Sequence, residues 1–296
     1  MASLLDRRTW SQLARAARAG ARTFRSQRPK RHYLAACLCF KDAARDLAEW
    51  LEFHRMVGVE HFYLYNNESS DHYAEVLRPY RDAGLVTFHD WPGAVQQAAT
   101  YEHCIESYRQ QARWIAFVDD DEFLFPTTGD DLRSKLVRYE DFAGVAVCRT
   151  VFGASGHEKR PDGLVIESYT RRQRALGTKI KSIVNPLEVR SATVHAFGYL
   201  RGAHAVDEKK RVLAGADISA PSVERLCMNH YYTKSFEDFR RKVERGRATR
   251  LEKRILPDEE AWKQEEALRS EVEDLVIQRF VPELKRRLAL PPAAAR

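Results

Sequence analysis

The chain has 296 residues, 44% of them hydrophobic, and a net charge of +7. This length suits one large domain or two small ones with a sizeable core, and no apolar run approaches the ~20 residues of a membrane-spanning helix. The basic excess lies in residues 1–31 and leaves the remaining chain nearly neutral, which argues against a nucleic-acid reader with a basic patch on its folded body.

Residues 1–31 are rich in Ala and Arg, with Trp10, Leu13 and Ala17 spaced to share one side of a helix. The pattern predicts a basic amphipathic helix that contacts an anionic membrane surface. A disordered tail is the alternative, and the Arg-rich, acid-poor composition is also typical of a transit peptide. We expect a cytoplasmic protein, either free or peripheral at the inner face of the membrane.

Strands and helices alternate from residue 33 onward. Buried strands are predicted at 33–40, 61–65, 85–89 and 114–118, where the sequence is apolar throughout. Apolar residues recur at helical spacing over 47–54 and over 101–108. A further helix is predicted to run to Tyr80 after an N-cap at Ser70 or Asp71. Apolar strands alternating with helices indicate an α/β fold with a mostly parallel sheet flanked by helices.

The regularity weakens after Pro126. We expect a helix near 130–139, strands at 144–151 and 164–169, a loop of small residues at 152–163 between them, and further strands within 178–206. A strand at 226–232 leads to a helix at 235–246, where Ser235 and Asp238 resemble a capping box. A charged amphipathic helix is predicted over 258–288.

The acidic segment "DDDEF" at 119–123 begins where the strand 114–118 ends. Ligands bind at the carboxyl ends of strands in open α/β sheets. In an extended chain Asp119 and Asp121 lie on the same side, and their oxygens suit Mg²⁺ or Mn²⁺ with substrate phosphates as the other ligands. A solvated acidic turn, or carboxylates that cap the next segment, is the alternative.

Several segments together resemble glycosyltransferase family 92 and its bacterial family 2-like relatives. They are "CFKDAARDLAEWLEFHRMVGVEHFYLYNNESSD" at 39–71, "DDDEF", "FGASGH" at 152–157, "KSIVNP" at 181–186 and "NHYYTKS" at 229–235. The resemblance covers about residues 33–250 and implies a GT-A fold, a nucleotide-sugar donor, a divalent metal ion and inversion at the anomeric carbon. It divides the chain into a tail at 1–31, a glycosyltransferase domain at 32–250 and a helical extension at 251–296.

The resemblance also assigns roles to single residues. It implies that Asp119 and Asp121 form the metal site, that Asp119 can instead contact the ribose, and that His230 completes the metal site. A structural histidine is the alternative for His230. Glu122 either braces the loop or contacts the sugar.

Further positions suit the donor nucleotide. Lys41, Asn66, Asn67, Asp71 and Gln97 follow or precede strands where the base and ribose are expected, although turn and cap residues have the same composition. Lys181 and Lys234 are the candidates to neutralise the diphosphate, and surface lysines are the alternative.

An inverting transfer needs a base that takes a proton from the acceptor hydroxyl. Glu167 and His157 are the preferred candidates, with Glu158 and Asp162 as alternatives. The predicted reaction moves a sugar from a nucleotide-diphosphate donor, preferably a UDP-sugar, to a glycan or another hydroxyl acceptor. The competing hypotheses are a sugar nucleotidyltransferase and a non-catalytic protein that binds a membrane or nucleic acid through its basic tail.

Overall fold

Four parallel strands form the first half of the central sheet, in the spatial order β3-β2-β1-β4. Their bounds are β1 His32–Phe40, β2 His61–Asn66, β3 Val86–Asp90 and β4 Ala112–Phe117. They come from a computed structural model that describes residues 29–246 and 255–289. All four coincide with the predicted apolar runs, because a strand covered on both faces must be apolar at every position.

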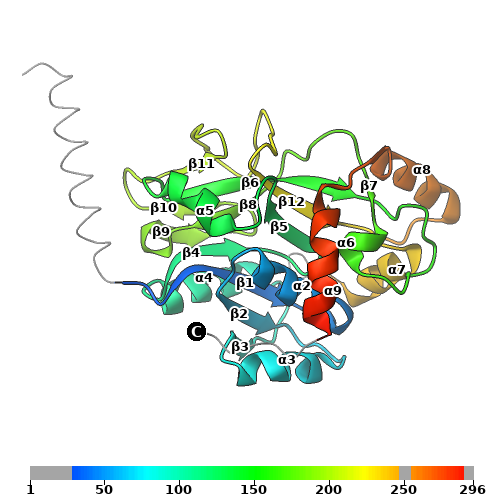
Figure 1. Cartoon of the computed structure of the whole chain (residues 1–296), viewed down its shortest axis with the longest axis horizontal. Helices are drawn as coiled ribbons and strands as arrows, with labels where there is room; N and C mark the ends of the chain where they lie inside the picture. Colours follow the sequence, from blue (N-terminus) through cyan, green and yellow to red (C-terminus); the bar gives the residue numbers. More distant parts are fainter. Residues whose placement is uncertain (1–28, 247–254, 290–296) are drawn as a thin grey trace, which may run out of the picture. The chain divides into compact units, whose positions relative to one another are not determined.

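Helices cover both faces of this parallel half (Figure 1). Leu34, Ala36 and Leu38 of β1 belong to a core with α2 Ala44–Met56 and α3 Tyr73–Asp82. The alternate residues of β1 face the opposite way and pack against α4 Gln97–Tyr108. The predicted α/β class, with a sheet flanked by helices, is confirmed.

The second half of the sheet is mixed and is built around β6 Gly144–Phe152. Its first residues pair antiparallel with β8 Ile180–Val184 and parallel with β11 Ala205–Asp207. Its last residues pair parallel with β12 Leu226–Tyr231, which in turn pairs antiparallel with β5 Glu122–Pro126. Because β8 also pairs with β4, the two halves form one sheet, and the end of β12 lies beside the start of β5.

Two shorter elements complete this half. β7 Arg171–Arg172 pairs with β6 at Phe152, and a separate two-stranded sheet joins β9 Val189–Ala192 to β10 Phe197–Tyr199. The helix predicted near 130–139 is α5 Leu132–Leu136, followed by the 3-10 helix η1 Val137–Tyr139. A second 3-10 helix, η2 Pro186–Glu188, precedes β9.

The strand predicted at 164–169 was wrong, because this segment contains the short helix α6 Val165–Ser168. The two carboxylate oxygens of Glu49 in α2 accept the N–H groups of Val165 at 2.8 Å and Ile166 at 3.0 Å. These are N–H groups of the first turn, which have no acceptor within their own helix. An acceptor more than 100 residues away in the chain therefore stabilises a helix that local sequence does not predict.

The single helix predicted over 258–288 is interrupted. The chain forms α8 Glu259–Arg269, β13 Val272–Glu273, the 3-10 helix η3 Val276–Phe280 and α9 Val281–Leu288. β13 adds to β7 at the edge of the sheet, and α9 packs against α2 (Figure 1). These elements belong to the same compact unit as the rest of the chain from His32 onward.

The predicted cap of the helix after β12 is confirmed at Ser235, but the reciprocal bond of a capping box is absent, because the N–H of Ser235 donates to the Tyr169 hydroxyl and not to Asp238. Ser235 precedes α7 Phe236–Arg245, and its Oγ accepts the N–H of Asp238 at 3.0 Å. The cap predicted for α3 takes another form, since Asp71 accepts the N–H of Tyr73 at 3.3 Å and also that of Ala44 at 2.7 Å. Asp71 thereby links the starts of α2 and α3.

The basic helix predicted in residues 1–31 lies almost wholly outside the described residues. Within residues 29–246 and 255–289, no helix is both long enough and apolar enough to cross a bilayer.

Candidate active site

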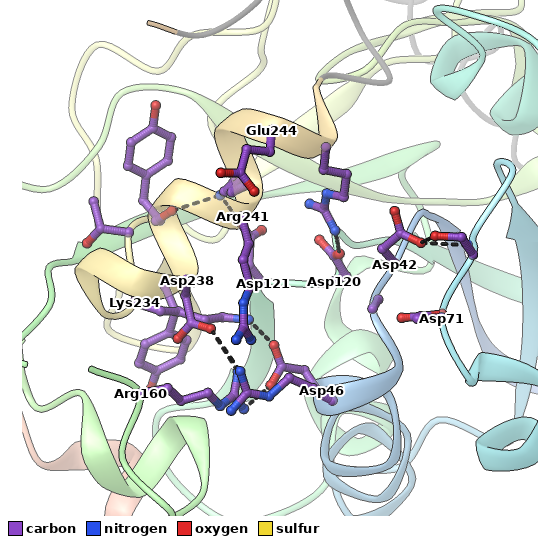
Figure 2. A pocket seen from close by; sticks show the side chains of 18 of the residues that line it. Asp42, Asp46, Asp71, Asp120, Asp121, Arg160, Lys234, Asp238, Arg241 and Glu244 are labelled. Carbon is purple, nitrogen blue, oxygen red and sulfur yellow. Dashed lines mark hydrogen bonds and ion pairs between the residues drawn. The ribbon is translucent and has the colours of Figure 1, made fainter. Parts of the chain in front are cut away.

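A cavity of about 610 Å³ opens at the carboxyl ends of the parallel strands (Figure 2). Its walls come from the segment that enters α2, the turn after β2, the acidic turn after β4, the loop after β6, and the end of β12 with α7. Thirteen of its lining side chains are acidic or basic: Asp42, Arg45, Asp46, Asp71, Asp120, Asp121, Arg160, Lys234, Asp238, Arg241, Lys242, Glu244 and Arg245. Seven are acids and six are bases, so the cavity wall is nearly neutral.

The acidic segment forms a tight turn between β4 and β5. The carbonyl oxygen of Asp119 accepts the N–H of Glu122 at 3.1 Å. Trp50 of α2 braces the turn by donating its indole N–H to the carbonyl oxygens of Asp119 at 2.9 Å and Glu122 at 3.0 Å. Because the chain turns here, the alternation expected of an extended segment does not apply.

Asp119 and Asp121 consequently have different partners, contrary to the prediction that they share one side. The Asp119 carboxylate lies 2.6 Å from the Lys181 ammonium and accepts the Gln97 amide at 2.6 Å. Burial opposes ionisation of Asp119, but Lys181 outweighs it and holds the pKa of the carboxyl below its usual value. Asp119 does not line the cavity.

Asp121 lines the cavity, and His230 contacts it from the end of β12 without lining the cavity itself. Its Oδ1 lies 3.5 Å from Nε2 of His230, and its Oδ2 pairs with the ammonium of Lys242 in α7. Burial opposes ionisation here too, but Lys242 and His230 keep the pKa of Asp121 well below its usual value. The structure therefore joins two of the three predicted metal ligands, Asp121 and His230, and directs Asp119 elsewhere.

Glu122 is fully buried beneath the turn and has a bracing role. Its Oε2 accepts the N–H of Asp119 at 3.0 Å and lies 3.3 Å from Lys181, and its Oε1 lies 3.5 Å from Arg149. Burial raises the pKa of Glu122 despite these cations. Lys181, on β8, is only 1% exposed, so it pairs with carboxylates of the turn and does not reach the cavity.

The donor set around Asp121 can be compared with what a metal ion needs. Within residues 29–246 and 255–289, no three His, Cys, Asp or Glu side chains come together as a metal site. Mg²⁺ and Mn²⁺ bind to one or two protein carboxylates when substrate phosphates supply the other ligands, and imidazole also suits Mn²⁺. Asp121 with His230 fits a cation that arrives with a phosphorylated substrate, provided that Lys242 leaves the carboxylate.

A second cluster of charges lines the cavity near the acidic turn (Figure 2). Asp46 of α2 pairs with both Lys234 and Arg160, and Arg160 lies 3.5 Å from Asp238. Burial opposes ionisation of Asp46, but Lys234 and Arg160 lower its pKa to about 2. The predicted residue Lys234 thus lines the cavity.

The residues predicted to contact the base and ribose separate into two groups. Asp71 lines the cavity, whereas Asn66 and Asn67 hold neighbouring turns together. The Asn66 amide donates to Asp90 at 2.9 Å, and the Asn67 amide donates to the carbonyl oxygens of Trp91 and Gly93. The Gln97 amide donates to Asp119 and Tyr101, and Lys41 offers its carbonyl oxygen to Arg245.

The two preferred base candidates lie outside the cavity. Glu167 pairs with Lys285 of α9 at 2.6 Å, because the helical conformation of α6 directs it toward that helix. Nε2 of His157 lies 3.2 Å from the carbonyl oxygen of Ser168. Glu158 borders a neighbouring cavity of about 620 Å³, and Asp162 lines neither cavity.

Sequence reasoning missed most of the charged cavity residues, and five of these make the ion pairs described here: Asp46, Arg160, Asp238, Lys242 and Arg245. Three of them are on α7, at positions 238, 242 and 245, which a helix places on one face. The Ser235 cap sets where this helix begins, so the grouping of these three positions on one face was predictable. The pairing of Asp46 with Arg160 was not, because 114 positions separate them.

Comparison with known proteins adds evidence from outside the chain. The model of Glycosyltransferase family 92 matches residues 32–259. A glycosyltransferase family 92 protein of Oryza sativa subsp. japonica is 30% identical over 219 residues, which are 73% of this chain and 36% of that protein. A glycosyltransferase family 92 protein of Ricinus communis is 30% identical over 228 residues, 74% of this chain and 39% of that protein.

A more distant relative is the galactan β-1,4-galactosyltransferase GALS2 of Arabidopsis thaliana, 29% identical over 107 residues, 33% of this chain and 21% of that protein. Among solved structures, TarS residues 1–349 of S. aureus in complex with UDP is 8% identical, with a TM-score of 0.37 over 52% of this chain and 47% of that one. This structural likeness is too low to carry a functional argument. The chain spans less than two-fifths of the length of the family 92 relatives above.

Proposed function

The chain belongs to glycosyltransferase family 92, and we propose that it transfers a sugar from a nucleotide-diphosphate donor to a hydroxyl group of a glycan or another acceptor. The observation that carries the proposal is the pairing of His230 with Asp121, which lines a cavity together with Lys234, Lys242 and Arg245. Carboxylate and imidazole suit a divalent ion, and the basic side chains suit a diphosphate.

UDP-galactose is the first donor to test, because the GALS2 relative is named as a galactosyltransferase. In this proposal Asp121 and His230 would hold Mn²⁺ or Mg²⁺, which would supply positive charge to stabilise the departing diphosphate. Trp50 and Glu122 keep the acidic turn in shape, and the Lys181 ion pair keeps Asp119 ionised beneath it. Inversion at the anomeric carbon remains part of the proposal.

Neither Glu167 nor His157 is proposed as the base that takes the proton from the acceptor hydroxyl, because neither reaches the cavity. Contact of residues 1–31 with an anionic membrane, a cytoplasmic location and the absence of nucleic-acid binding also belong to the proposal. Deletion of residues 1–31 separates the tail from the site: we expect the shortened chain to retain nucleotide binding.

A thermal-shift experiment tests the proposed donor and metal. We expect UDP with Mn²⁺ to raise the melting temperature of the wild-type protein more than either ligand alone. Asp121→Asn should abolish this combined shift, while Asp130→Asn, at a carboxylate with a 76% exposed side chain away from the cavity, should retain it. If no nucleoside diphosphate stabilises the wild type with or without Mn²⁺, the proposed function is wrong.

A further inference from the structure

Each carboxylate of the acidic turn is already paired with a cation of the protein. Asp119 pairs with Lys181, Asp120 with Arg245 at 2.9 Å, and Asp121 with Lys242. The buried Glu122 beneath them lies 3.5 Å from Arg149. The turn is therefore electrically balanced before any ligand binds.

Two of these cations come from one helix at the rim of the cavity. Lys242 and Arg245 are three positions apart in α7, which brings them to the same face above the turn. Lys242 also donates to the carbonyl oxygen of Tyr232 at 2.8 Å and lies 4.7 Å from the centre of its ring. Lys181 differs, because it projects from the interior of the sheet and is 1% exposed.

Lys242 forms an ion pair with a carboxylate oxygen of Asp121 that a metal ion would need as a ligand. Its ammonium pairs with Oδ2 of Asp121, whose Oδ1 faces His230. A divalent ion that binds alone must compete with this ammonium and would leave two excess positive charges in a partly buried site. A divalent ion that binds with a diphosphate brings compensating negative charge, and the phosphate oxygens offer new partners to Lys242 and Arg245.

We propose that Lys242 and Arg245 bind the diphosphate of the donor, and that Lys242 occupies the metal position on Asp121 until metal and diphosphate bind together. The inference rests on the proposed function and adds to it an order of preference among ligands. The free site disfavours the bare metal ion and favours the metal–diphosphate pair. Because coupling between two ligands is reciprocal, the metal strengthens diphosphate binding by the same factor.

Binding of Mn²⁺ without nucleotide tests the competition directly. Free Mn²⁺ is measured by electron paramagnetic resonance during titration of the full-length protein. Lys242→Met should bind Mn²⁺ about tenfold more tightly than the wild type, because one charge-assisted hydrogen bond no longer competes. Lys242→Arg retains the cation and should leave the affinity nearly unchanged, as should the exposed control Lys263→Met on α8.

Binding of UDP in saturating Mn²⁺ tests the diphosphate contacts. By titration calorimetry, Lys242→Met and Arg245→Met should each weaken UDP binding about tenfold, the effect of losing one charge-assisted contact to phosphate. Arg245→Met should leave the affinity for Mn²⁺ alone within about twofold, because Arg245 pairs with Asp120 and not with Asp121. Lys242 therefore affects the two ligands in opposite directions, which a general loss of stability would not do.

The inference is overturned if Lys242→Met binds Mn²⁺ no more tightly than the wild type, or if both methionine variants bind UDP as the wild type does. If the wild type still binds UDP and Mn²⁺, either result rules out the roles inferred for Lys242 and Arg245 but leaves the proposed function in place. If neither the wild type nor Lys242→Met binds UDP in the presence of Mn²⁺, the proposed function itself fails.

Discussion

Trp50 is the residue that most directly sets the shape of the acidic turn. Its side chain is fully buried, and its N–H is shared by two carbonyl oxygens of the turn. Trp50→Phe keeps an aromatic ring in the core but removes the indole donor from both oxygens, at a cost of about 1–3 kcal/mol in unfolding free energy. Urea unfolding measures this cost, and UDP binding should weaken in the same variant.

Trp114→Phe is the matched control, since Trp114 is a second fully buried tryptophan, on β4. It should lose stability through the smaller ring while nucleotide affinity stays near that of the wild type. Equal loss of affinity in both variants would show that Trp50 acts through general packing and not through the turn.

Asp46 gives the site a defined response to acid. Its pKa falls from 3.8 to about 2 in the folded protein, so the folded state binds fewer protons than the unfolded state between these values. The stabilisation is complete above about pH 4 and is lost as the pH falls toward 2. At neutral pH it amounts to about 2 kcal/mol of unfolding free energy.

Chemical unfolding from pH 5 to pH 2 measures this response. Asp46→Asn should be less stable at neutral pH, because Lys234 and Arg160 lose their shared carboxylate, and its stability should fall less steeply in acid. If the unfolding free energy falls equally steeply with pH in the wild type and in the variant, other carboxylates cause the loss of stability in acid.

At the scale of elements, α7 connects folding with ligand binding. Ser235 caps its first turn, and the same helix carries Lys242 and Arg245 over the acidic turn. Ser235→Ala should cost about 1 kcal/mol of stability and weaken UDP binding by loosening the start of the helix. Urea unfolding measures the loss of stability, and calorimetric titration of the same preparation measures the affinity for UDP.

Asp258→Ala removes the comparable cap of α8, where Asp258 accepts the N–H of Ala261 at 2.8 Å. This control should lose similar stability but keep its affinity for UDP, because no residue of α8 lines the cavity. The link between the cap and the site fails if both variants bind UDP equally well.

The elements also show how far sequence reasoning reaches. The four parallel strands were predictable because each is an apolar run, and α7 because its cap residues are local. α6 was not predictable, since the acceptor of its first N–H groups is Glu49, far away in the chain. The position of the acidic turn followed from its strand, but its partners Lys242 and Lys181 come from α7 and β8, which no local pattern assigns to it.

At the scale of the whole molecule, the end of the chain is part of the core that supports the site. The family match ends at residue 259, yet Leu284 of α9 is fully buried and Phe280 packs against Phe53 of α2 with ring centres 5.5 Å apart. α2 also carries Asp46 and Trp50, so α9 supports the helix that holds both the turn and the second charge cluster.

Leu284→Ala should therefore lower the unfolding free energy by about 2–5 kcal/mol, because it leaves a cavity between α9 and α2. Leu268→Ala, at a position 68% exposed on α8, should change it by less than about 0.5 kcal/mol. Thermal or urea unfolding of the two variants decides this, and equal stabilities would contradict a supporting role for α9.

The near-neutral wall of the cavity bears on the charge of the ligand that it can accept. Seven acids and six bases line it, so it suits a ligand whose own charges nearly cancel, such as a divalent ion bound to a diphosphate. The net positive charge of the full chain therefore does not indicate the charge of the ligand that the cavity binds.

A crystal structure of the protein soaked with Mn²⁺ and UDP shows whether Asp121 and His230 bind the metal ion. We predict an anomalous manganese peak between Asp121 and His230, with the ammonium of Lys242 moved from Asp121 to a phosphate oxygen. A peak elsewhere, or no peak with Lys242 still paired to Asp121, would contradict the account.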